Sequence, residues 1–378
     1  MKTAIIHDQL SEFGGAERVL IALKKIFPQA DVFTSVYKPE SLGVHSKIFK
    51  EWKINESWFG RIPFLRNYYS PFRFATAWIW ESFDLSKYDL VISSSGSWMS
   101  KGVITKPQTL HVCYIHHPPR YLYYYPTAVS WQKYLPVRIY GHLINHFLRV
   151  FDYLSAQRPD ILIANSFETK KRIKKFYKRD SEVIYPPVNI PDKLESQYIS
   201  GKRQEFYLTV SRLARAKNID LLIKAFNKLG KKLVVVGEGK DREYLESIAD
   251  KNIVFKGNIT DKNLKELYLR AKAFVFASKD EEFGIAPVEA LGYAVPVIAF
   301  ASGGVKEYIK SYENGLLYQK LEVGALASAI MSFEGLSERK TLQMRKNARR
   351  TAKNFTFSQF KRKILSFIKS RGKEDLEL

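Results

Sequence analysis

The sequence contains a single cysteine, Cys113, and it lacks any uninterrupted apolar run long enough to span a membrane. One cysteine excludes an internal disulfide framework and any multi-cysteine metal site. The segment Met1–Asp8 turns polar too early to form a signal peptide. We therefore expect a cytoplasmic protein without structural disulfides.

Acidic residues are also scarce, because 38 Asp and Glu stand against 61 Lys and Arg, a net charge of +23. Such an excess favours an anionic partner: nucleic acid, anionic lipid or a phosphorylated ligand. The chain has no zinc-finger spacing, basic-region heptads or aromatic RNA-binding signature, so we expect no nucleic-acid partner.

A cationic, aromatic segment marks the first half of the chain. Residues 101–150 contain six Lys or Arg, no Asp or Glu, and many aromatic residues. This composition suits an anionic membrane surface. The aromatic residues of 48–80 have two interpretations, namely the same membrane surface or packing inside the first domain, and Trp78 and Trp80 at alternate positions favour packing.

A chain of 378 residues exceeds the usual size of one hydrophobic core, so we expect two domains. In the first half a strand, a glycine loop and a helix-period run form a βα unit. Strands are predicted there at 3–7, 31–37, 90–93, 110–116 and 161–165. The segment Tyr134–Leu154 has helical periodicity but carries charges, which predicts an amphipathic or packed helix.

The second half alternates strand-like and helix-like segments more regularly. We expect strands at 206–210, 232–236, 253–255, 273–277 and 296–300, with helices that begin near residues 219, 241, 261, 286 and 304. This alternation predicts an α/β protein with two Rossmann-like, doubly wound parallel-sheet domains facing across a cleft. The predicted divisions are a first domain, a linker, a second domain and a C-terminal helix that packs back on the first domain, at 1–190, 191–203, 204–355 and 356–378.

Two glutamates eight residues apart, Glu281 and Glu289, flank a predicted strand-to-helix junction. Gly284 permits a tight turn there, and Pro287 suits the first position of a helix. We expect Glu281 in the loop and Glu289 in the first helical turn, at the end of a parallel strand where ligands bind. The alternative is that Glu289 only complements the helix dipole and Glu281 is a solvated loop residue.

Three further loops carry chemistry that suits a phosphorylated ligand. Arg212 and Lys217 bracket a turn that leads into a helix, which suits a diphosphate, although a solvated basic loop is the plainer interpretation. Gly14 and Gly15 follow the first strand and allow backbone N–H groups to approach a phosphate. Glu238 lies between two glycines, where a tight turn or a nearby nucleotide base would explain the sequence.

A histidine, His116, ends a predicted strand of the first domain. Such a histidine orients a sugar or assists proton transfer, or else is a satisfied structural residue. No Ser-His-Asp order and no metal-ligand cluster is visible in the sequence, so hydrolase and metalloenzyme interpretations lack their residues.

Together these motifs resemble glycosyltransferase family 4, the retaining enzymes with the two-domain GT-B fold, over nearly the whole chain. The Phe13–Glu17 loop, Val210–Lys217, the Glu281–Glu289 spacing and Ser302–Glu307 resemble blocks of that family in order and spacing. The segment Tyr114–Leu122 resembles a block of bacterial mannosyltransferases that build O-antigen and capsule. It departs from that block at Ile115, His117 and Pro119, and Glu282 and Ala286 stand where many relatives have Gly and Pro.

The resemblance implies an acceptor-binding first domain and a nucleotide-sugar-binding second domain. Arg212 and Lys217 would neutralise the departing diphosphate, Glu281 would bind the transferred sugar, Glu289 would bind the ribose, and His116 would lie near the sugar. The implied catalytic residues are Glu281, His116, Arg212 and Lys217. The implied donor-binding residues are Gly14, Gly15, Arg212, Lys217, Glu238, Glu281, Phe283, Gly284, Ile285 and Glu289. It also implies no cofactor and no metal.

The leading hypothesis is a retaining transferase that moves a hexose, mannose from GDP-mannose, to a lipid-linked glycan or polysaccharide precursor. We expect it in the cytoplasm, peripherally associated with the inner face of the plasma membrane. The alternatives are a UDP-sugar-dependent transferase of the same family, a nucleotide-sugar epimerase or hydrolase on the same fold, and a non-enzymatic nucleic-acid or membrane-binding protein.

Overall fold

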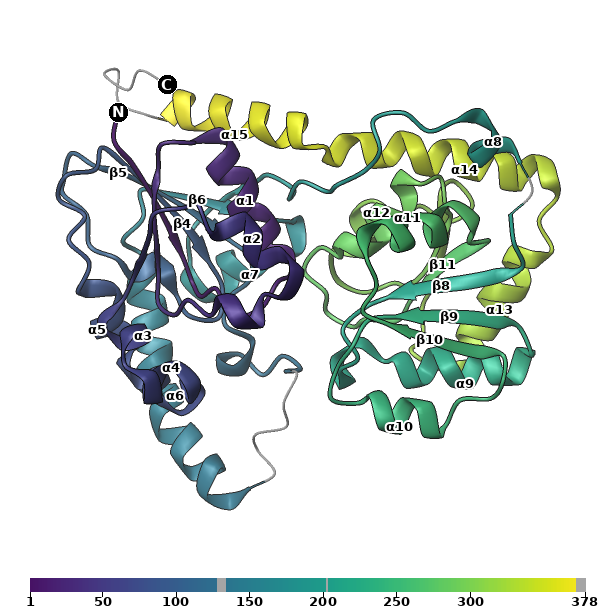
Figure 1. Cartoon of the computed structure of the whole chain (residues 1–378), viewed down its shortest axis with the longest axis horizontal. Helices are drawn as coiled ribbons and strands as arrows, with labels where there is room; N and C mark the ends of the chain where they lie inside the picture. The colour runs from purple at the N-terminus through teal and green to yellow at the C-terminus, as the bar shows by residue number, and fades with distance from the viewer. Residues whose placement is uncertain (128–133, 202, 372–378) are drawn as a thin grey trace. The chain divides into compact units, whose positions relative to one another are not determined.

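The computed structural model describes residues 1–127, 134–201 and 203–371, and the chain divides into two compact units. Unit 1 comprises Met1–Pro187 with the described part of Phe357–Leu378, and unit 2 comprises Val188–Thr356. Each unit is an α/β layer structure around one parallel sheet (Figure 1), as the alternation of apolar and helix-period segments predicts.

Unit 1 contains a seven-stranded sheet in the order β3-β2-β1-β4-β5-β6-β7, with parallel pairing throughout. Its strands are β1 (Thr3–His7), β2 (Asp31–Thr34), β3 (Ile54–Glu56), β4 (Leu90–Ser95), β5 (Leu110–Ile115), β6 (Ile161–Ala164) and β7 (Glu182–Val183). Its helices are α1 (Gly15–Ile26), α2 (Ser46–Phe49), α3 (Trp58–Arg61), α4 (Pro63–Asn67), α5 (Thr76–Glu81), α6 (Leu135–Ser155), α7 (Phe167–Tyr177) and α15 (Phe357–Arg371).

Side chains alternate between the two buried faces of the unit 1 sheet. Ile5 of β1 packs with Leu20 of α1 on one face, whereas its neighbours Ala4 and Ile6 pack on the other face with Trp80 of α5. This period of two is the geometry of an extended strand, and burial on both faces explains why β1 is apolar without interruption.

The C-terminal helix α15 completes the first of these faces. It packs beside α1 (Figure 1) and buries Phe360, Ile364 and Ile368 in the same cluster as Ile5. These residues recur at helical spacing, so one stripe of α15 is apolar. Each buried side chain of this kind contributes about 1.5–3 kcal/mol, which ties a segment distant in sequence to unit 1.

Unit 2 contains a six-stranded parallel sheet in the order β10-β9-β8-β11-β12-β13. Its strands are β8 (Phe206–Val210), β9 (Lys232–Val236), β10 (Ile253–Gly257), β11 (Ala273–Phe276), β12 (Val297–Phe300) and β13 (Gly315–Tyr318). Its helices are α8 (Ser196–Ser200), α9 (Ile219–Leu229), α10 (Arg242–Ser247), α11 (Asp261–Arg270), α12 (Ile285–Gly292), α13 (Val323–Glu334) and α14 (Glu338–Ala352).

Some elements differ from the sequence-based expectation. The expected linker 191–203 falls inside unit 2, where it forms α8 and buries Arg203, whose guanidinium donates to the carbonyl oxygens of Tyr268 and Tyr293. The helix expected near residue 304 is a short 3₁₀ helix, Gly303–Glu307. Three strands, β3, β7 and β13, were not predicted, because β3 is polar, β7 has two residues and β13 begins with glycine.

Among the described residues, no helix combines the length and the apolarity that crossing a membrane requires. Helix α6 has 21 residues, but Arg138 and Arg149 lie within it and Asp152 is buried near its end. Of the two predictions for this segment, an amphipathic helix describes α6 better than a packed helix, because the first half of α6 exposes Leu135, Leu143 and other apolar side chains.

Candidate active site

The loop after β8 places Lys217 beside the loop after β11. A 3₁₀ turn, Arg215–Lys217, precedes α9, and Asn218 between them adopts a left-handed conformation with φ of 51°. The Asn218 amide Nδ2 donates to the Ala277 carbonyl over 2.9 Å, so the β8–α9 loop is fastened to the end of β11. Asn and Gly adopt this backbone region most readily, which explains an asparagine at this position.

Lys217 and Glu281 form an ion pair between the β8–α9 loop and the loop after β11. The Lys217 Nζ lies 2.6 Å from Glu281 Oε2, and the two side chains are 20 % and 19 % exposed. Because the pair is partly buried, dissolved salt screens its attraction less than it screens that of an exposed ion pair. The contact presents a cation and a carboxylate together at the carboxyl ends of parallel strands, where a phosphate and a hydroxyl group could be bound at once.

Glycines let other backbone segments approach the Glu281 loop closely. Gly303 has a φ of +65°, and a Cβ there would lie 2.0 Å from the Glu281 carbonyl oxygen. The Gly304 N–H donates to that same oxygen over 2.9 Å. Gly284 also has positive φ, +84°, and precedes the first residue of α12, Ile285. Backbone packing therefore fixes the position of Glu281.

Two sequence-based details at this junction are wrong. Helix α12 begins at Ile285, so Pro287 is its third residue and Glu289 lies in its second turn rather than its first. Proline is tolerated there because the first helical N–H groups have no partner within the helix. Glu289 is buried and accepts a hydrogen bond from the Tyr268 hydroxyl over 3.1 Å. Its place in the second turn weakens the interpretation that it only complements the helix dipole.

The phenylalanine of this loop, Phe283, faces the interior of unit 2. Its ring lies 5.3 Å from the ring of Tyr308 and 5.4 Å from that of Phe355. The Tyr308 hydroxyl lies 2.8 Å from the Phe283 carbonyl oxygen, and burial, with Glu281 as a further cause, raises the pKa of Tyr308. Phe283 could therefore reach a donor only through its backbone.

Two buried arginines hold the C-terminal end of α12. Arg349 donates from Nη1 to the Gly292 carbonyl over 2.7 Å, and Arg203 donates from Nη2 to the Tyr293 carbonyl over 2.8 Å. Burial, followed by repulsion from Arg345, lowers the pKa of Arg203 to about 10. Cations at this end complement the helix dipole. The other end of α12, with its unpaired N–H groups, directly follows the Glu281 loop.

The Gly237-Glu238-Gly239 turn packs directly on the loop after β8. A Cβ at Gly237 would lie 2.0 Å from the Ser211 carbonyl oxygen, and one at Gly239 would lie 2.1 Å from that of Leu213. Close backbone approach thus accounts for both glycines. The Glu238 carboxylate pairs with Arg242 of α10. Arg212 occupies the packed loop, between β8 and Lys217.

In unit 1 the glycine loop leads into α1, as expected. The Gly14 N–H, however, donates to Glu17 Oε2 over 2.7 Å, so a residue of α1 occupies this donor. Gly15 is the first residue of α1. His116 follows β5, and its Nε2 lies 2.8 Å from the Ser94 hydroxyl at the end of β4. Both features lie at the carboxyl edge of the unit 1 sheet.

Asp8 was missed by the sequence analysis, although it directly follows β1. One carboxylate oxygen accepts from the Gly96 and Trp98 N–H groups over 2.9 and 2.7 Å, and the other accepts from the Ser100 N–H over 2.9 Å. A carboxylate that accepts from three backbone donors fixes the first part of the β4–β5 loop, from Gly96 to Ser100. The signal was an acidic residue at the end of a buried strand, but only long-range contacts show its partners.

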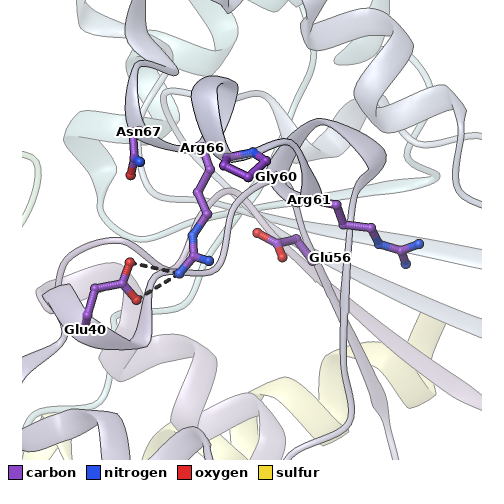
Figure 2. Close-up of a pocket in the computed structure, with 7 residues that line it drawn as sticks. Glu40, Glu56, Gly60, Arg61, Arg66 and Asn67 are labelled. Atoms are coloured by element: carbon purple, nitrogen blue, oxygen red, sulfur yellow. Dashed lines mark hydrogen bonds and ion pairs between the residues drawn. The ribbon is translucent and has the colours of Figure 1, made fainter.

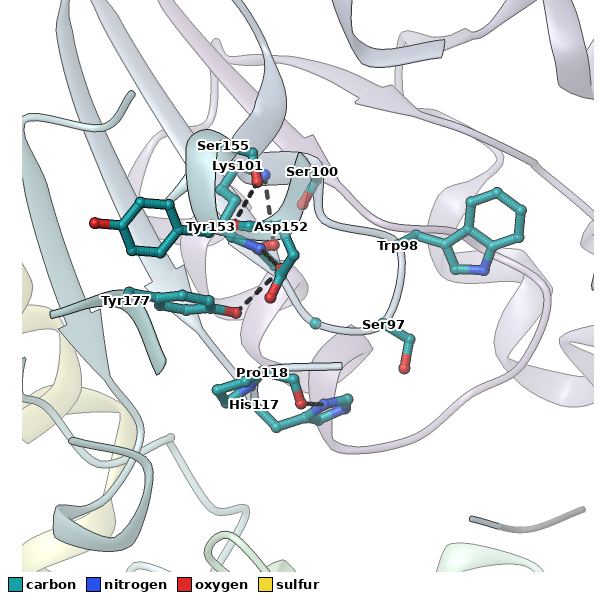
Figure 3. A network of polar contacts seen from close by, with 12 residues as sticks. Ser97, Trp98, Ser100, Lys101, His117, Pro118, Asp152, Tyr153, Ser155 and Tyr177 are labelled. Carbon is teal, nitrogen blue, oxygen red and sulfur yellow. Dashed lines mark hydrogen bonds and ion pairs between the residues drawn. The ribbon is translucent and has the colours of Figure 1, made fainter. Parts of the chain in front are cut away.

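The same loop is fastened to α6 by a buried polar network, in which Lys101, Asp152 and Tyr177 converge (Figure 3). Asp152 on α6 pairs with the Lys101 ammonium group and accepts hydrogen bonds from the Tyr177 hydroxyl over 3.1 Å and the Tyr123 hydroxyl over 2.6 Å. Both members of the ion pair are buried. The loop is therefore held by Asp8 on one side and by Asp152 on the other.

A polar hollow of about 310 Å³ opens beyond the end of β3 (Figure 2). Its lining comprises Glu40, Glu56, Gly60, Arg61, Pro63, Arg66 and Asn67. Arg66 Nη2 lies 2.8 Å from both carboxylate oxygens of Glu40, so this pair forms one wall of the hollow. Glu56 is half-buried and accepts the Tyr37 N–H over 2.8 Å. No sequence signal singled out these residues.

Among residues 1–127, 134–201 and 203–371, no group of three or more His, Cys, Asp or Glu side chains is arranged to hold a metal ion. Within unit 2 the structure joins Lys217 to Glu281, and it places Arg212 and Glu238 on two neighbouring loops. Glu289 lies deeper, against Tyr268. Gly14, Gly15 and His116 occupy the corresponding edge of the sheet in unit 1.

Two α/β units, each built on one sheet of parallel strands with its candidate residues at the carboxyl ends of those strands, are the components of the GT-B fold. HepE of Anabaena, solved in complex with UDP, shares this fold with a TM-score of 0.71 at 20 % identity, and the match covers 98 % of this chain and 100 % of HepE. Sucrose-phosphate synthase of Thermosynechococcus elongatus matches with a TM-score of 0.71 at 17 % identity, over 98 % and 99 % of the two chains.

The family model described as Glycosyltransferase Family 4 matches residues 13–191, and the one described as Glycosyl transferases group 1 matches residues 192–351. The chain belongs to glycosyltransferase family 4. The family assignment and the α/β fold made from the sequence are thereby confirmed.

Curated relatives match at lower coverage. The mouse GDP-Man:Man(3)GlcNAc(2)-PP-Dol alpha-1,2-mannosyltransferase is 30 % identical over 58 % of this chain and 50 % of its own length. The GtfA subunit of UDP-N-acetylglucosamine–peptide N-acetylglucosaminyltransferase from Streptococcus pneumoniae is 26 % identical over 63 % of this chain and 47 % of its own length. The chain thus spans about half the length of these relatives.

Proposed function

We propose that this protein is a retaining glycosyltransferase that moves a hexose, mannose from GDP-mannose, onto a lipid-linked glycan or polysaccharide precursor. The observation that carries the proposal is the 2.6 Å contact between Lys217 and Glu281 at the carboxyl edge of the unit 2 sheet. A nucleotide sugar offers a diphosphate to the cation and sugar hydroxyls to the carboxylate.

Lys217 has three N–H donors, so a bond to Glu281 leaves two for phosphate oxygens. Negative charge grows on the diphosphate as the glycosidic bond breaks, and a cation positioned beforehand stabilises that charge most. Arg212 on the same loop would add a second cation, and the N–H groups at the start of α12 would add dipoles. We propose that these groups take the place of a metal ion and that no cofactor is needed.

Glu281 would bind hydroxyls of the transferred sugar and Glu289 those of the ribose. The buried carboxylate of Glu289 is oriented by Tyr268, which supports a fixed acceptor role rather than a solvated one. His116 and the Gly14-Gly15 loop would contribute from unit 1. Glu238, Phe283, Gly284 and Ile285 would line the donor through the loops described above.

Mannose is favoured because the mouse relative named above uses a GDP-Man donor according to its name. The GtfA relative and the HepE structure carry UDP in their names. A UDP-sugar donor is therefore the second candidate. An epimerase or hydrolase on the same fold would turn over donor without acceptor, which separates it from a transferase.

The experiment compares GDP-mannose with UDP-glucose and UDP-N-acetylglucosamine, measuring donor affinity by calorimetry and nucleoside diphosphate release with membrane-extracted acceptor. Lys217→Met and Glu281→Gln should each lower kcat on the order of 10²–10³-fold. Lys279→Ala, which removes an exposed lysine from the same loop, should leave kcat unchanged. Full turnover in both site variants would refute the assignment.

We propose that unit 1 docks on an anionic membrane and so brings the acceptor to the site from the cytoplasmic face. Exposed apolar side chains gather on α3 to α5 and on α6, namely Trp58, Phe64, Tyr68, Trp78, Leu143 and Phe147. We call these six residues the apolar face. The Tyr140 hydroxyl of α6 bonds to the Pro71 carbonyl, so the two groups of helices adjoin. The polar hollow beside α4 could accommodate a polar part of the acceptor.

The membrane proposal predicts co-sedimentation with vesicles containing phosphatidylglycerol and not with neutral phosphatidylcholine vesicles. A double variant of the apolar face, Phe64→Ser with Trp78→Ser, should bind vesicles at least about tenfold more weakly, because each side chain buries apolar area in the headgroup layer. Tyr244→Ser removes an exposed aromatic residue of unit 2 and should have no effect. Equal binding to both vesicle types would contradict the electrostatic account.

A further inference from the structure

An arginine of unit 1, Arg73, lies over two aromatic rings at the carboxyl edge of the sheet. It belongs to a 3₁₀ helix, Ser70–Ala75. The guanidinium carbon lies 4.3 Å from the centre of the Tyr121 ring and 5.8 Å from that of the Trp98 ring. Trp98 follows β4 and is buried, and the Tyr121 hydroxyl donates to the Ser97 carbonyl oxygen over 3.2 Å. Two fixed rings therefore orient the guanidinium.

The positive charge of Arg73 has no acidic partner in the part of the chain that the structure describes. No Asp or Glu there forms an ion pair with Arg73, and its Nε atom is buried without a hydrogen-bond partner. Arg158, which also lies over an aromatic ring, pairs with Glu81 instead. Asp8 accepts the Trp98 N–H and directs its carboxylate at backbone donors. Because half-buried charges in proteins are usually paired, Arg73 is suited to an anionic ligand.

A second cation, Lys38, flanks the same group of rings. It follows β2, and its Nζ lies 5.3 Å from the centre of the Tyr69 ring, which lies 5.7 Å from the Trp98 ring. Lys38 also forms no ion pair with a described residue. Strands β2 and β4 run parallel in one sheet, so Lys38 and Trp98 lie at the same edge, where α/β proteins bind ligands.

The neighbours of Arg73 in the chain connect it to the apolar face. The Phe72 ring lies 6.0 Å from that of Phe74 and 5.8 Å from that of Phe64. The exposed Phe74 ring in turn lies 6.5 Å from that of Trp78. Phe64 and Trp78 belong to the apolar face, so Arg73 is placed where the apolar face meets the edge of the sheet.

We infer that Arg73, assisted by Lys38, binds the diphosphate that joins the acceptor glycan to its lipid carrier. An arginine presents a planar fork of N–H donors that matches phosphate oxygens, and a lysine adds a mobile point charge. The hydrocarbon chain of the carrier would contact the apolar face, and the glycan would extend along the carboxyl edge of the sheet. This inference rests on the proposed lipid-linked acceptor and is independent of which sugar the donor carries.

The test is calorimetric binding of geranyl diphosphate, a short lipid diphosphate, to the full-length protein without donor. Arg73→Gln should weaken binding about ten- to a hundredfold, because charge-assisted hydrogen bonds to phosphate are lost. Arg73→Lys should recover part of that loss, because it restores the charge but not the fork. Lys38→Gln, which leaves the rings around Arg73 unchanged, should weaken binding about tenfold.

An exposed lysine of unit 1 provides the charge control. Lys50→Gln removes one positive charge, as Arg73→Gln does, and should change the affinity for geranyl diphosphate less than about twofold. Equal losses in Lys50→Gln and Arg73→Gln would overturn the inference, because net charge alone would then explain the binding.

A variant of unit 2 separates this site from the donor site, since a diphosphate also suits Lys217. Binding of geranyl diphosphate should persist in Lys217→Met. A loss in Lys217→Met with none in Arg73→Gln would mean that the diphosphate binds in unit 2, which contradicts the inference. These measurements involve neither donor nor turnover, so failure of the proposed transferase activity would be seen separately in the donor comparison.

Two further probes distinguish the source of the phosphate. Inorganic pyrophosphate should bind more weakly than geranyl diphosphate, because it lacks the hydrocarbon chain that contacts the apolar face. Equal affinities would show an anion site without a lipid part. Arg73→Gln should leave co-sedimentation with phosphatidylglycerol vesicles within about twofold of the unsubstituted protein. A loss confined to vesicles would mean that Arg73 meets phospholipid headgroups, and either result would refute the assignment.

Kinetics with the active donor should separate binding from chemistry. Arg73→Gln should raise the KM for the acceptor about tenfold or more with kcat nearly unchanged, because the lipid diphosphate is bound equally in the ground state and the transition state. Lys217→Met should instead lower kcat. An Arg73→Gln variant with a reduced kcat and an unchanged acceptor KM would contradict a role in acceptor binding.

Discussion

The loops at the carboxyl edge of the unit 2 sheet are held by backbone packing at glycines, whereas the equivalent loops of unit 1 are held by buried polar side chains. In unit 2, Gly237, Gly239 and Gly303 bring carbonyl oxygens within 2.0–2.1 Å of where a Cβ would lie. In unit 1, Asp8 and the Lys101–Asp152 pair fasten the β4–β5 loop. Backbone packing places residues rigidly, while a side-chain network can transmit a proton or charge.

The largest expected effect is the loss of one member of the buried ion pair in unit 1. Lys101→Met should destabilise unit 1 by about 3–5 kcal/mol, because it leaves the Asp152 carboxylate buried without its cation. All six tryptophans precede residue 188, so the intrinsic tryptophan fluorescence reports unit 1 during denaturant unfolding.

The double variant Lys101→Met with Asp152→Leu is the control for that experiment. Replacing both charges by apolar groups should recover much of the loss. The exposed pair Arg270–Glu266 offers a surface comparison, and Arg270→Met should cost less than about 1 kcal/mol. A loss in Lys101→Met as small as that of the surface pair would mean that the polar network does not hold unit 1.

The contrast between the units also explains what the sequence could predict. Strands β8 and β9 of unit 2 were predicted residue for residue, because apolar runs and glycine turns encode them locally. The Lys217 and Glu281 loops were identified from their positions after strands. Asp8, His7 and Ser94 were not identified from the sequence, because each contacts a partner roughly 90 residues away in the chain. No local pattern encodes such contacts.

Glu289 illustrates the same limit at short range. The spacing to Glu281 was visible in the sequence, but the register of α12 depends on Gly284 and on the two arginines that hold its other end. Helix ends are the least certain part of such a prediction. The two glutamates therefore differ in environment more than their spacing indicates, one paired with a lysine and the other buried against a tyrosine.

A glycine substitution tests the unit 2 side of the comparison. Gly303→Ala should destabilise unit 2 by about 3 kcal/mol, since it combines a positive φ with a Cβ only 2.0 Å from the Glu281 carbonyl oxygen. Calorimetric unfolding should show the loss, and kcat should fall because Glu281 moves. Gly324→Ala in α13, where a Cβ has open space, should instead be neutral or slightly stabilising. Equal unfolding temperatures for the two variants would contradict the backbone-packing account.

The smallest expected effect is a pH dependence confined to unit 1. Burial, with Arg179 and Arg158 as further causes, lowers the pKa of His111 from 6.5 to about 3. A depressed histidine pKa means that the unfolded chain binds a proton that the folded unit does not. Stability is therefore full above pH 6.5 and is lost as the pH falls toward 3, by about 2 kcal/mol at pH 5. Tryptophan fluorescence during denaturant unfolding at pH 7 and pH 5 measures this, and His111→Gln should remove that part of the pH dependence. If His111→Gln leaves the difference in unfolding free energy between pH 7 and pH 5 unchanged, the acid sensitivity of unit 1 arises from other groups.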